Sequence, residues 1–189
     1  MQPSSGPPPS VDQDEEADQV DVSAFPNGLR VCYIDDSKAA LRTLEVGLPR
    51  HLGAAEVKTF GHNGPDDVPR FMEHAPQADI IMFDHHIDFP GAHTSGLELL
   101  RTIKAGGFQG LLIMRSGNTS DQDCLQYREA GCHCILDKAV PTAQAGDVIK
   151  KAYLRRERSR APPDQAQSSC STANTSVVPF SNLLGENEV

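Results

Sequence analysis

Residues 79–84 read Asp-Ile-Ile-Met-Phe-Asp, with four large apolar side chains in a row between two aspartates. A strand that is buried on one face alternates apolar and polar residues, whereas a strand buried on both faces is apolar throughout. This stretch therefore predicts a strand in the interior of a parallel sheet. Four more short segments predict further strands, at residues 29–34, 56–60, 110–114 and 132–136.

A helical pattern follows each predicted strand. Leucines recur at helical spacing in residues 37–52, and Ser95 with Glu98 forms a capping-box pattern at the start of a later helix. Gly131 closes a helix over residues 120–130. Two other predicted helices cover residues 66–75 and 142–155. Strands that alternate with helices predict an α/β fold, in which right-handed crossovers cover both faces of a parallel sheet.

The chain has 189 residues, which predicts one domain with tails. Residues 1–27 are rich in Pro, Asp and Glu and contain no Lys or Arg, and residues 159–189 are rich in Ser, Thr, Asn and Gln. Such segments bury too little apolar surface to offset the entropy of ordering, so both are predicted to be disordered. The domain is therefore expected at residues 28–158.

Composition excludes several classes of protein. The sequence has no apolar run of about 18 residues that could span a membrane, and its N-terminus lacks the basic start and apolar run of a secretory signal. The net charge is −9, and the domain itself is nearly neutral, so no broad basic surface for nucleic acid is expected. Five cysteines without a secretory signal predict reduced thiols in a soluble intracellular protein, in the cytoplasm or the nucleus.

Polar side chains follow four of the predicted strands. Asp35 and Asp36 follow the first, Asp84 the third, Ser116 the fourth and Lys138 the fifth. Because ligands of parallel sheets bind at the carboxyl ends of the strands, we expect these side chains to meet at one edge. Carboxylates that lie close together repel unless a cation joins them, and oxygen ligands suit Mg²⁺. The lysine and the serine add donors suited to an anion such as a phosphoryl group.

The segments VCYIDD (31–36), IIMFD (80–84), LLIMRSG (111–117) and CILDK (134–138) carry a resemblance to a known family. In their order and spacing the sequence resembles the response-regulator receiver domain of two-component signalling, over residues 28–158. The resemblance implies a stand-alone receiver with a flavodoxin-like, doubly wound sheet of five parallel strands in the order 2-1-3-4-5.

The resemblance also implies a role for each acid. Asp84 would be the phosphoacceptor, whose carboxylate takes a phosphoryl group from phosphohistidine. Asp35 and Asp36 would hold Mg²⁺ together with Asp84 and the backbone carbonyl of His86, directly or through water.

Lys138 and Ser116 complete the implied site. Lys138 would neutralise oxygens of the phosphoryl group, and Ser116 would bond one of them after transfer and draw its loop inward. Such a receiver catalyses its own phosphorylation and is not a multi-turnover enzyme on external substrates.

The sequence departs from the family pattern at three places. Ala139 stands where the family has a proline with a cis bond, and because a cis bond there would cost about 3 kcal/mol, a trans or reshaped loop is expected. Ile135 stands at the position of the family's switch aromatic, which puts the usual coupling to Ser116 in doubt. The loop after Asp84 is longer than usual and contains His85, His86 and His93.

Several side chains have alternative interpretations. The resemblance implies that the side chains of His86 and Asn118 influence phosphoryl lifetime, and a zinc site on the loop histidines is an alternative. Cys132 and Cys134 alternate along a predicted strand, so both are expected to face the same side as small buried apolar groups.

The expected partners are proteins. The upstream partner would be a histidine kinase or a histidine phosphotransfer protein. The residues after 158 are too few for a DNA-binding output domain, so we expect a downstream protein to dock near residues 119–156. Two alternatives stay open: a degenerate receiver that binds proteins without phosphorylation, and a Mg²⁺-dependent phosphohydrolase.

Overall fold

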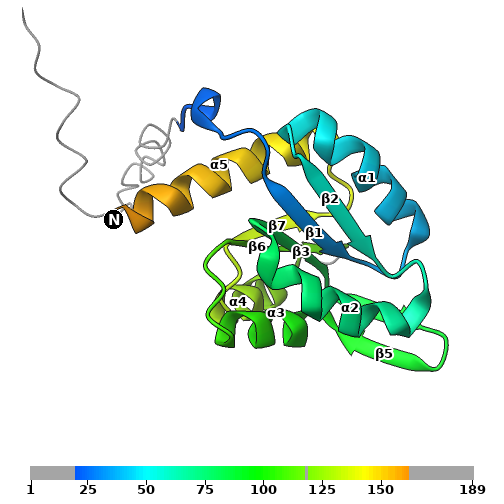
Figure 1. The fold of residues 1–189 in the computed structure, drawn as a ribbon. Coiled ribbons are helices and arrows are strands. Elements are labelled where there is room, and N and C mark those ends of the chain that lie inside the picture. The colour runs from blue at the N-terminus through cyan, green and yellow to red at the C-terminus, as the bar shows by residue number, and fades with distance from the viewer. Residues whose placement is uncertain (1–19, 118, 162–189) are drawn as a thin grey trace, which may run out of the picture. The chain divides into compact units, whose positions relative to one another are not determined.

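The computed structural model describes residues 20–117 and 119–161. Five parallel strands form one sheet in the order β2-β1-β3-β6-β7 (Figure 1). Their bounds are Glu56–Phe60 for β2, Arg30–Ile34 for β1, Ile80–Asp84 for β3, Leu111–Ser116 for β6 and Cys134–Asp137 for β7. Counted within this sheet alone, the order is 2-1-3-4-5, which confirms the predicted doubly wound, flavodoxin-like fold.

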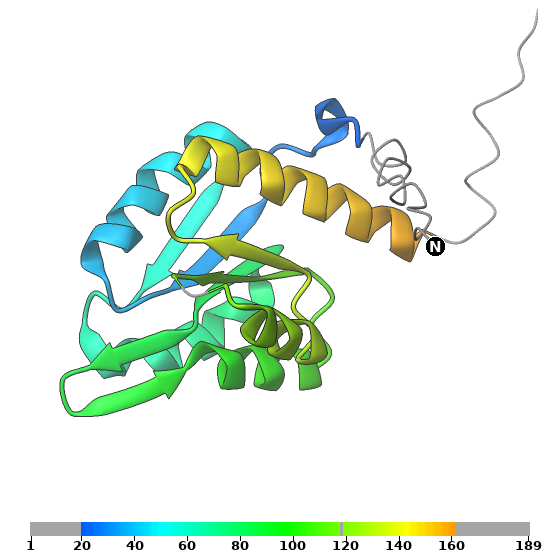
Figure 2. The same ribbon diagram turned by 180° about the vertical axis from the view of Figure 1, so that it is seen from behind.

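Helices cover both faces of the sheet (Figures 1 and 2). One face carries α1 and α5, and the other carries α2, α3 and α4. Their bounds are Lys38–Leu52 for α1, Asp67–His74 for α2, Gly96–Ala105 for α3, Asp121–Glu129 for α4 and Thr142–Arg160 for α5. Short 3-10 helices lie at Val22–Ala24, Gly64–Asp66 and Ala75–Gln77. Within the described ranges no helix is long and apolar enough to cross a membrane.

Strand β3 explains why the fold could be predicted. Its side chains alternate between the two cores: Ile80 and Met82 pack with α1 and α5, and Ile81 and Phe83 pack with α2, α3 and α4. All four are fully buried. A strand with a helix layer on each face must be apolar along its buried length, as this one is from Ile80 to Phe83.

The serines at the starts of α1 and α3 behave differently. Ser37 caps α1 by accepting a hydrogen bond from the backbone N–H of Ala40. The capping box predicted at Ser95 and Glu98 is wrong, because the Ser95 side chain makes no capping hydrogen bond. Ser95 instead ends a strand that pairs with His86, and this pairing sets the entry to α3.

The long segment after Asp84 is a β-hairpin rather than an irregular loop. Strands β4 (His86–Phe89) and β5 (Ala92–Ser95) pair antiparallel and form a separate two-stranded sheet (Figure 1). Ile87 and Phe89 are buried against the core beneath α2, α3 and α4. The hairpin is thus anchored to the domain by its apolar side.

Residues 20–27, which the sequence analysis assigns to the N-terminal tail, are among the residues that the structure describes. Val20 and Phe25 are buried, and the Phe25 ring packs edge to face on Tyr153 of α5, with ring centroids 5.4 Å apart. At the other end α5 runs to Arg160, past the predicted boundary at residue 158. The predictions of disorder for residues 1–19 and 162–189 lie outside the described residues.

The prediction that Cys132 and Cys134 face the same side is also wrong. Cys134 begins β7 and packs with α1 and α5, but Cys132 precedes the strand and packs in the opposite core. Both are buried free thiols, as expected. Alternation applies only within a strand, and Cys132 lies outside one.

Candidate functional site

The carboxyl ends of the strands bring the predicted site together. In the parallel register Phe83 of β3 lies beside Ile34 of β1, and Asp84 lies beside Arg115 of β6. Residues just beyond these positions therefore emerge at the same height. Asp35 and Asp36 follow β1, Asp84 ends β3, Ser116 ends β6 and Lys138 follows β7.

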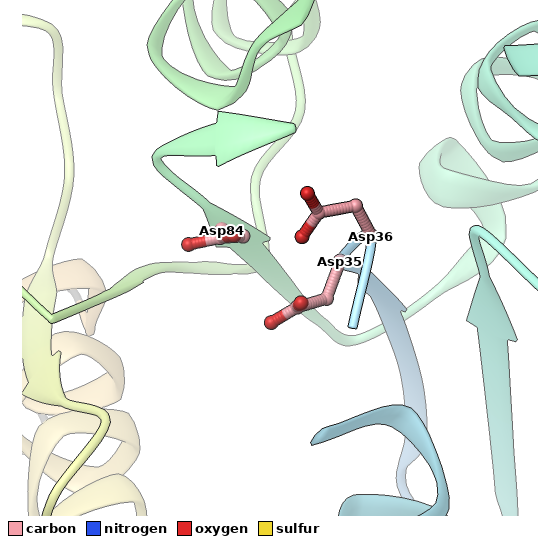
Figure 3. Close-up of side chains that lie close together, drawn as sticks. All are labelled: Asp35, Asp36 and Asp84. Carbon is pink, nitrogen blue, oxygen red and sulfur yellow. The ribbon is translucent and has the colours of Figure 1, made fainter. Parts of the chain in front are cut away.

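Three carboxylates form a cluster at this edge (Figure 3). Asp35, Asp36 and Asp84 each offer an oxygen, and these oxygens all lie within 4.8 Å of one another. Asp35 and Asp84 are buried, and Asp36 is half-buried. A set of carboxylate oxygens at this spacing fits a hard divalent cation such as Mg²⁺.

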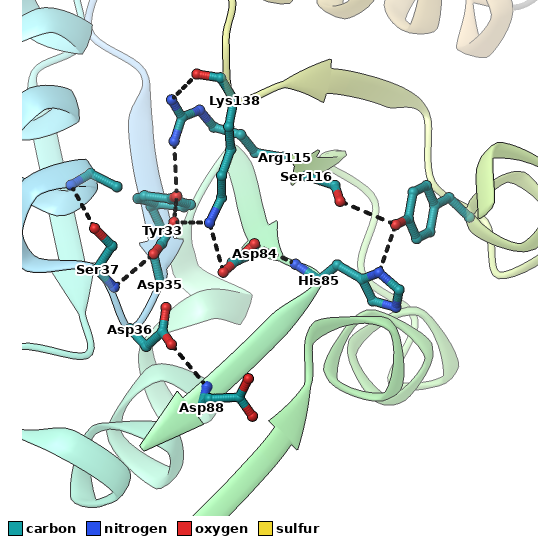
Figure 4. A network of polar contacts seen from close by, with 12 residues as sticks. Tyr33, Asp35, Asp36, Ser37, Asp84, His85, Asp88, Arg115, Ser116 and Lys138 are labelled. Carbon is teal, nitrogen blue, oxygen red and sulfur yellow. Dashed lines mark hydrogen bonds and ion pairs between the residues drawn. The ribbon is translucent and has the colours of Figure 1, made fainter. Parts of the chain in front are cut away.

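The Lys138 ammonium joins two of these carboxylates (Figure 4). Its Nζ lies 2.8 Å from Asp84 Oδ2 and 3.1 Å from Asp35 Oδ2. Burial alone would lower the pKa of Lys138, but the hydrogen bond to Asp84 and the charges of both carboxylates outweigh burial, so its pKa is raised. Lys138 is therefore firmly cationic in this site.

Asp84 carries negative charge that Lys138 does not fully compensate. Burial, together with the like charge of Asp35, raises the pKa of Asp84 to about 6, although the ammonium of Lys138 acts in the opposite direction. The buried carboxylate thus lacks enough positive charge around it. This is the electrostatic condition under which a further cation is bound favourably.

Backbone N–H groups fix the orientation of each acid. The N–H of Ser37 donates to Asp35 Oδ1 at 2.8 Å, and the N–H of His85 donates to Asp84 Oδ1 at 2.8 Å. The N–H of Asp88, in the hairpin strand β4, donates to Asp36 Oδ2 at 3.0 Å. The hairpin therefore takes part in building the site.

Ser116 lies at the same edge, but its hydroxyl is turned toward α4 (Figure 4). The buried Tyr127 hydroxyl donates to Ser116 Oγ at 3.4 Å and lies 2.7 Å from His85 Nδ1. These contacts link the residue after Asp84, the end of β6 and helix α4. The sequence analysis missed Tyr127, because nothing in a helical tyrosine indicates which strand end it reaches.

Two more residues of the site were missed. The Tyr33 hydroxyl donates to Asp35 Oδ2, and the Arg115 guanidinium donates to Tyr33 and to the backbone carbonyl of Lys138. One signal was available: Arg115 is the one charged residue of the strand LLIMRS and directly follows four apolar residues. A charge in a buried strand needs a partner, and that partner here is a polar group at the site.

The departures from the family pattern take definite forms. Every peptide bond of residues 20–117 and 119–161 is trans. The bond between Lys138 and Ala139 is therefore trans, which is one of the two expected forms of this loop. Ile135 is half-buried and packs against the core beneath α2, α3 and α4. Asn118 lies outside the described residues.

The loop histidines do not form a metal site of their own. In the part of the chain that the structure describes, the three aspartates are the one group of three or more His, Cys, Asp or Glu side chains placed to share an ion. His86 stacks on His85, with ring centroids 4.0 Å apart, and His93 lies 2.5 Å from Asp88. The zinc alternative therefore has no support in the geometry.

The solved structures that this chain resembles include response-regulator receivers. DrrB of Thermotoga maritima matches with a TM-score of 0.56 and 24% identity, over 69% of this chain and 54% of that one, so the chain spans about half of DrrB. The BeF3-activated receiver domain of DrrB matches with a TM-score of 0.54 and 22% identity, over 66% of this chain and 97% of that one. A CheY-like receiver domain protein from Methanospirillum hungatei matches with a TM-score of 0.57 and 21% identity, over 70% and 99% of the two chains. No protein-family model and no curated protein matched the sequence.

Proposed function

We propose that this chain, whose domain has the fold of a response-regulator receiver, is a phosphoacceptor in a two-component phosphorelay. It takes a phosphoryl group from phosphohistidine onto Asp84 and signals through a partner protein. The observation that carries the proposal is the buried carboxylate of Asp84 at the end of a central strand, bonded by Lys138 and flanked by two further acids.

Asp84 supplies the nucleophile of the transfer. One of its oxygens attacks the phosphorus of the donor, the bond between phosphorus and the imidazole nitrogen breaks, and the imidazole leaves with the electron pair and takes up a proton. Although burial raises the pKa of Asp84 to about 6, the carboxylate is still mostly ionised at neutral pH and able to attack. The Lys138 ammonium, 2.8 Å from Oδ2, lies where the oxygens of a transferred phosphoryl group need positive charge.

The proposed metal ligands are Asp35, Asp36, Asp84 and the backbone carbonyl of His86, two residues after the acceptor. The carboxylate cluster fits Mg²⁺ by its oxygen donors, its spacing and its uncompensated negative charge. When bound, Mg²⁺ supplies positive charge that stabilises the oxygens of the phosphoryl group.

Ser116 provides the proposed route from phosphorylation to a partner. When its hydroxyl turns to bond a phosphoryl oxygen, it leaves the hydroxyl of Tyr127, and α4 loses a contact with the site. The partner that reads this change would dock near residues 119–156, which include α4, β7 and most of α5. The donor upstream would be a histidine kinase or a histidine phosphotransfer protein.

We further propose that the protein acts inside the cell, without binding nucleic acid or a membrane itself. Its one self-phosphorylation makes it a signalling domain and not a multi-turnover enzyme.

The second candidate is a degenerate receiver that binds partners without phosphorylation. It is favoured by the hydrogen bonding of the site, which groups of the chain itself satisfy. Both oxygens of Asp35 accept hydrogen bonds, and in the described ranges every buried side-chain nitrogen and oxygen has a partner. In this candidate the only role of the network is to stabilise the fold.

Incubation with Mg²⁺ and acetyl phosphate separates the candidates. Intact-mass spectrometry should show one added phosphoryl group on the wild type, none on Asp84→Asn and none after addition of EDTA. The control is Asp79→Asn: Asp79 immediately precedes the same strand at its opposite end, and its variant should be modified like the wild type. No modification of any protein would favour the binding module. Sustained release of phosphate from phosphomonoesters would favour a hydrolase.

A further inference from the structure

Arg115 is a buried cation beside the proposed phosphoacceptor, yet the structure gives it no ion pair with Asp84. Its side chain lies in β6 next to Asp84 of β3, with the residue only 8% exposed. Nη1 donates to the Tyr33 hydroxyl at 3.3 Å, and Nη2 donates to the backbone carbonyl of Lys138 at 3.2 Å. The guanidinium therefore spans from β1 to the loop after β7.

Tyr33 continues this chain of contacts to Asp35. Its ring is fully buried two residues before Asp35 in the sequence, and its hydroxyl donates to Asp35 Oδ2. The same oxygen accepts from Lys138 Nζ at 3.1 Å. Arg115, Tyr33, Asp35 and Lys138 thus form a closed ring of hydrogen bonds (Figure 4).

We propose that Arg115 and Tyr33 are positioning residues that hold Lys138 at both ends, by its backbone carbonyl and, through Asp35, by its ammonium. The proposal deepens the proposed function and rests on it for its effect on phosphoryl transfer. Neither side chain bonds to Asp84, the proposed phosphoacceptor: Tyr33 donates to Asp35, and Arg115 donates to Tyr33 and to Lys138.

The loop after β7 explains why Lys138 needs such support. The N–H of Lys138 donates to the carbonyl of Ser116 at 3.0 Å. However, β7 ends at Asp137, one residue before Lys138, and α5 begins only at Thr142. Ala139 follows, and alanine does not fix the backbone as the ring of a proline would. Locally, Asp137 accepts from the N–H of Ala139 through its carboxylate at 2.7 Å and from the N–H of Val140 through its carbonyl at 3.1 Å. The guanidinium of Arg115 adds a restraint on the carbonyl of Lys138 from a different strand.

An alternative explanation of Arg115 is charge balance alone. Asp35 and Asp84 bring two negative charges to the buried edge, and a second cation beside Lys138 would offset them. Lysine at position 115 would keep that charge but has one ammonium in place of a planar fork with separated N–H groups. The variant Arg115→Lys therefore distinguishes positioning from charge.

Amide hydrogen exchange in the presence of EDTA tests the ring without any phosphoryl donor. We expect exchange at residues 138–140 to be about tenfold faster, or more, in both Arg115→Lys and Arg115→Met, because a hydrogen bond from a charged donor is lost. Exchange in β2 should not change. If Arg115→Lys exchanges like the wild type while Arg115→Met does not, charge balance explains the residue and the proposal is overturned.

Tyr33→Phe is the milder variant, because it keeps the buried ring and removes only the hydroxyl. It should speed exchange at residues 138–140 severalfold, whereas Tyr153→Phe, the same change far from the site, should not. If the Arg115 variants fail to fold, the comparison of Tyr33→Phe with Tyr153→Phe tests the proposal in their place. Unchanged exchange in Tyr33→Phe overturns the proposal.

Phosphorylation kinetics give a readout that a merely structural role would not produce. With acetyl phosphate, Arg115→Lys should lower the rate at saturating Mg²⁺ about tenfold and leave the half-saturating Mg²⁺ concentration unchanged, because the Arg115 guanidinium donates to Tyr33 and to the Lys138 carbonyl and not to a proposed ligand. A raised half-saturating concentration with an unchanged maximal rate contradicts positioning of Lys138. If the wild type is never phosphorylated but the exchange results hold, the ring stands and the proposed function fails.

Discussion

Replacement of Asp84 by Asn is expected to stabilise the metal-free protein at neutral pH, although it removes the proposed phosphoacceptor. Burial is the main reason that the pKa of Asp84 rises from 3.8 to about 6. A carboxyl with a raised pKa stabilises the fold fully below its unfolded pKa. It loses that contribution as the pH rises through about 6, since the unfolded chain then releases the proton more readily.

The magnitude follows from the shift. About two pKa units at about 1.4 kcal/mol each make the ionised carboxylate cost about 3 kcal/mol at pH 7 and almost nothing below pH 4. Asn keeps the shape but loses one acceptor for the neighbouring N–H groups, which costs about 1 kcal/mol at every pH. The net gain at pH 7 is therefore about 2 kcal/mol, and the part that depends on pH is about 3 kcal/mol.

The free energy of unfolding of the wild type and of Asp84→Asn can be measured by urea denaturation with EDTA, from about pH 4 to about pH 7. The difference between the proteins is needed, because burial, with nearby cations, lowers the pKa of His133 to about 4, which gives both proteins an opposite pH dependence. Asp67→Asn is the control, because its effect on stability at neutral pH should have the opposite sign. Burial there is outweighed by hydrogen bonds from Asn63 and Gly61, so its pKa is lowered and its variant loses stability at neutral pH. A difference between Asp84→Asn and wild type that does not vary with pH would refute the reasoning.

Three further changes have defined outcomes. Lys138→Met leaves the buried Asp84 without its cation and should cost about 3 kcal/mol in EDTA by urea denaturation, with part of the loss restored by Mg²⁺. Ile87→Ala opens a cavity beneath the hairpin and should cost about 2–5 kcal/mol, and calorimetric titration should show weaker Mg²⁺ binding because the hairpin orients one ligand. Gly96→Ala places a Cβ in steric clash with the Asp84 carbonyl oxygen and should lower the melting temperature strongly, whereas Gly117→Ala, where a Cβ meets nothing within 4 Å, should not.

The sheet and the carboxylate cluster could be predicted because both follow from the geometry of parallel strands. The apolar run before Asp84 identifies a strand buried on both faces, and the register of neighbouring strands then fixes which residues share an edge. Asp35, Asp84 and Lys138 were found in this way, and they lie within hydrogen-bonding distance. Their roles in phosphoryl transfer remain predictions.

The remaining contacts depend on side chains that cross between elements. Arg115 and Tyr33 meet only because β6 and β1 flank β3 and both side chains face α1 and α5, which no local pattern in either strand encodes. The hairpin could have been recognised. Ile87 and Phe89 alternate with polar residues, and Pro-Gly at residues 90 and 91 is a turn signal.

Two buried aspartates show which candidate function the electrostatics favour. Asp67 is 2% exposed and its hydrogen bonds outweigh the cost of burial, so its pKa is lowered, as expected for a carboxylate that serves structure. Asp84 is 5% exposed and accepts from Lys138, yet its pKa is raised to about 6, with burial as the main cause. A network built only to hold the fold would stabilise the charged form of Asp84 enough to outweigh burial. Hydrogen bonds do this for Asp67. Positive charge is instead insufficient where three carboxylates lie within 4.8 Å of one another, so a cation that binds there lowers the free energy of the site. This favours the phosphoacceptor over the degenerate receiver.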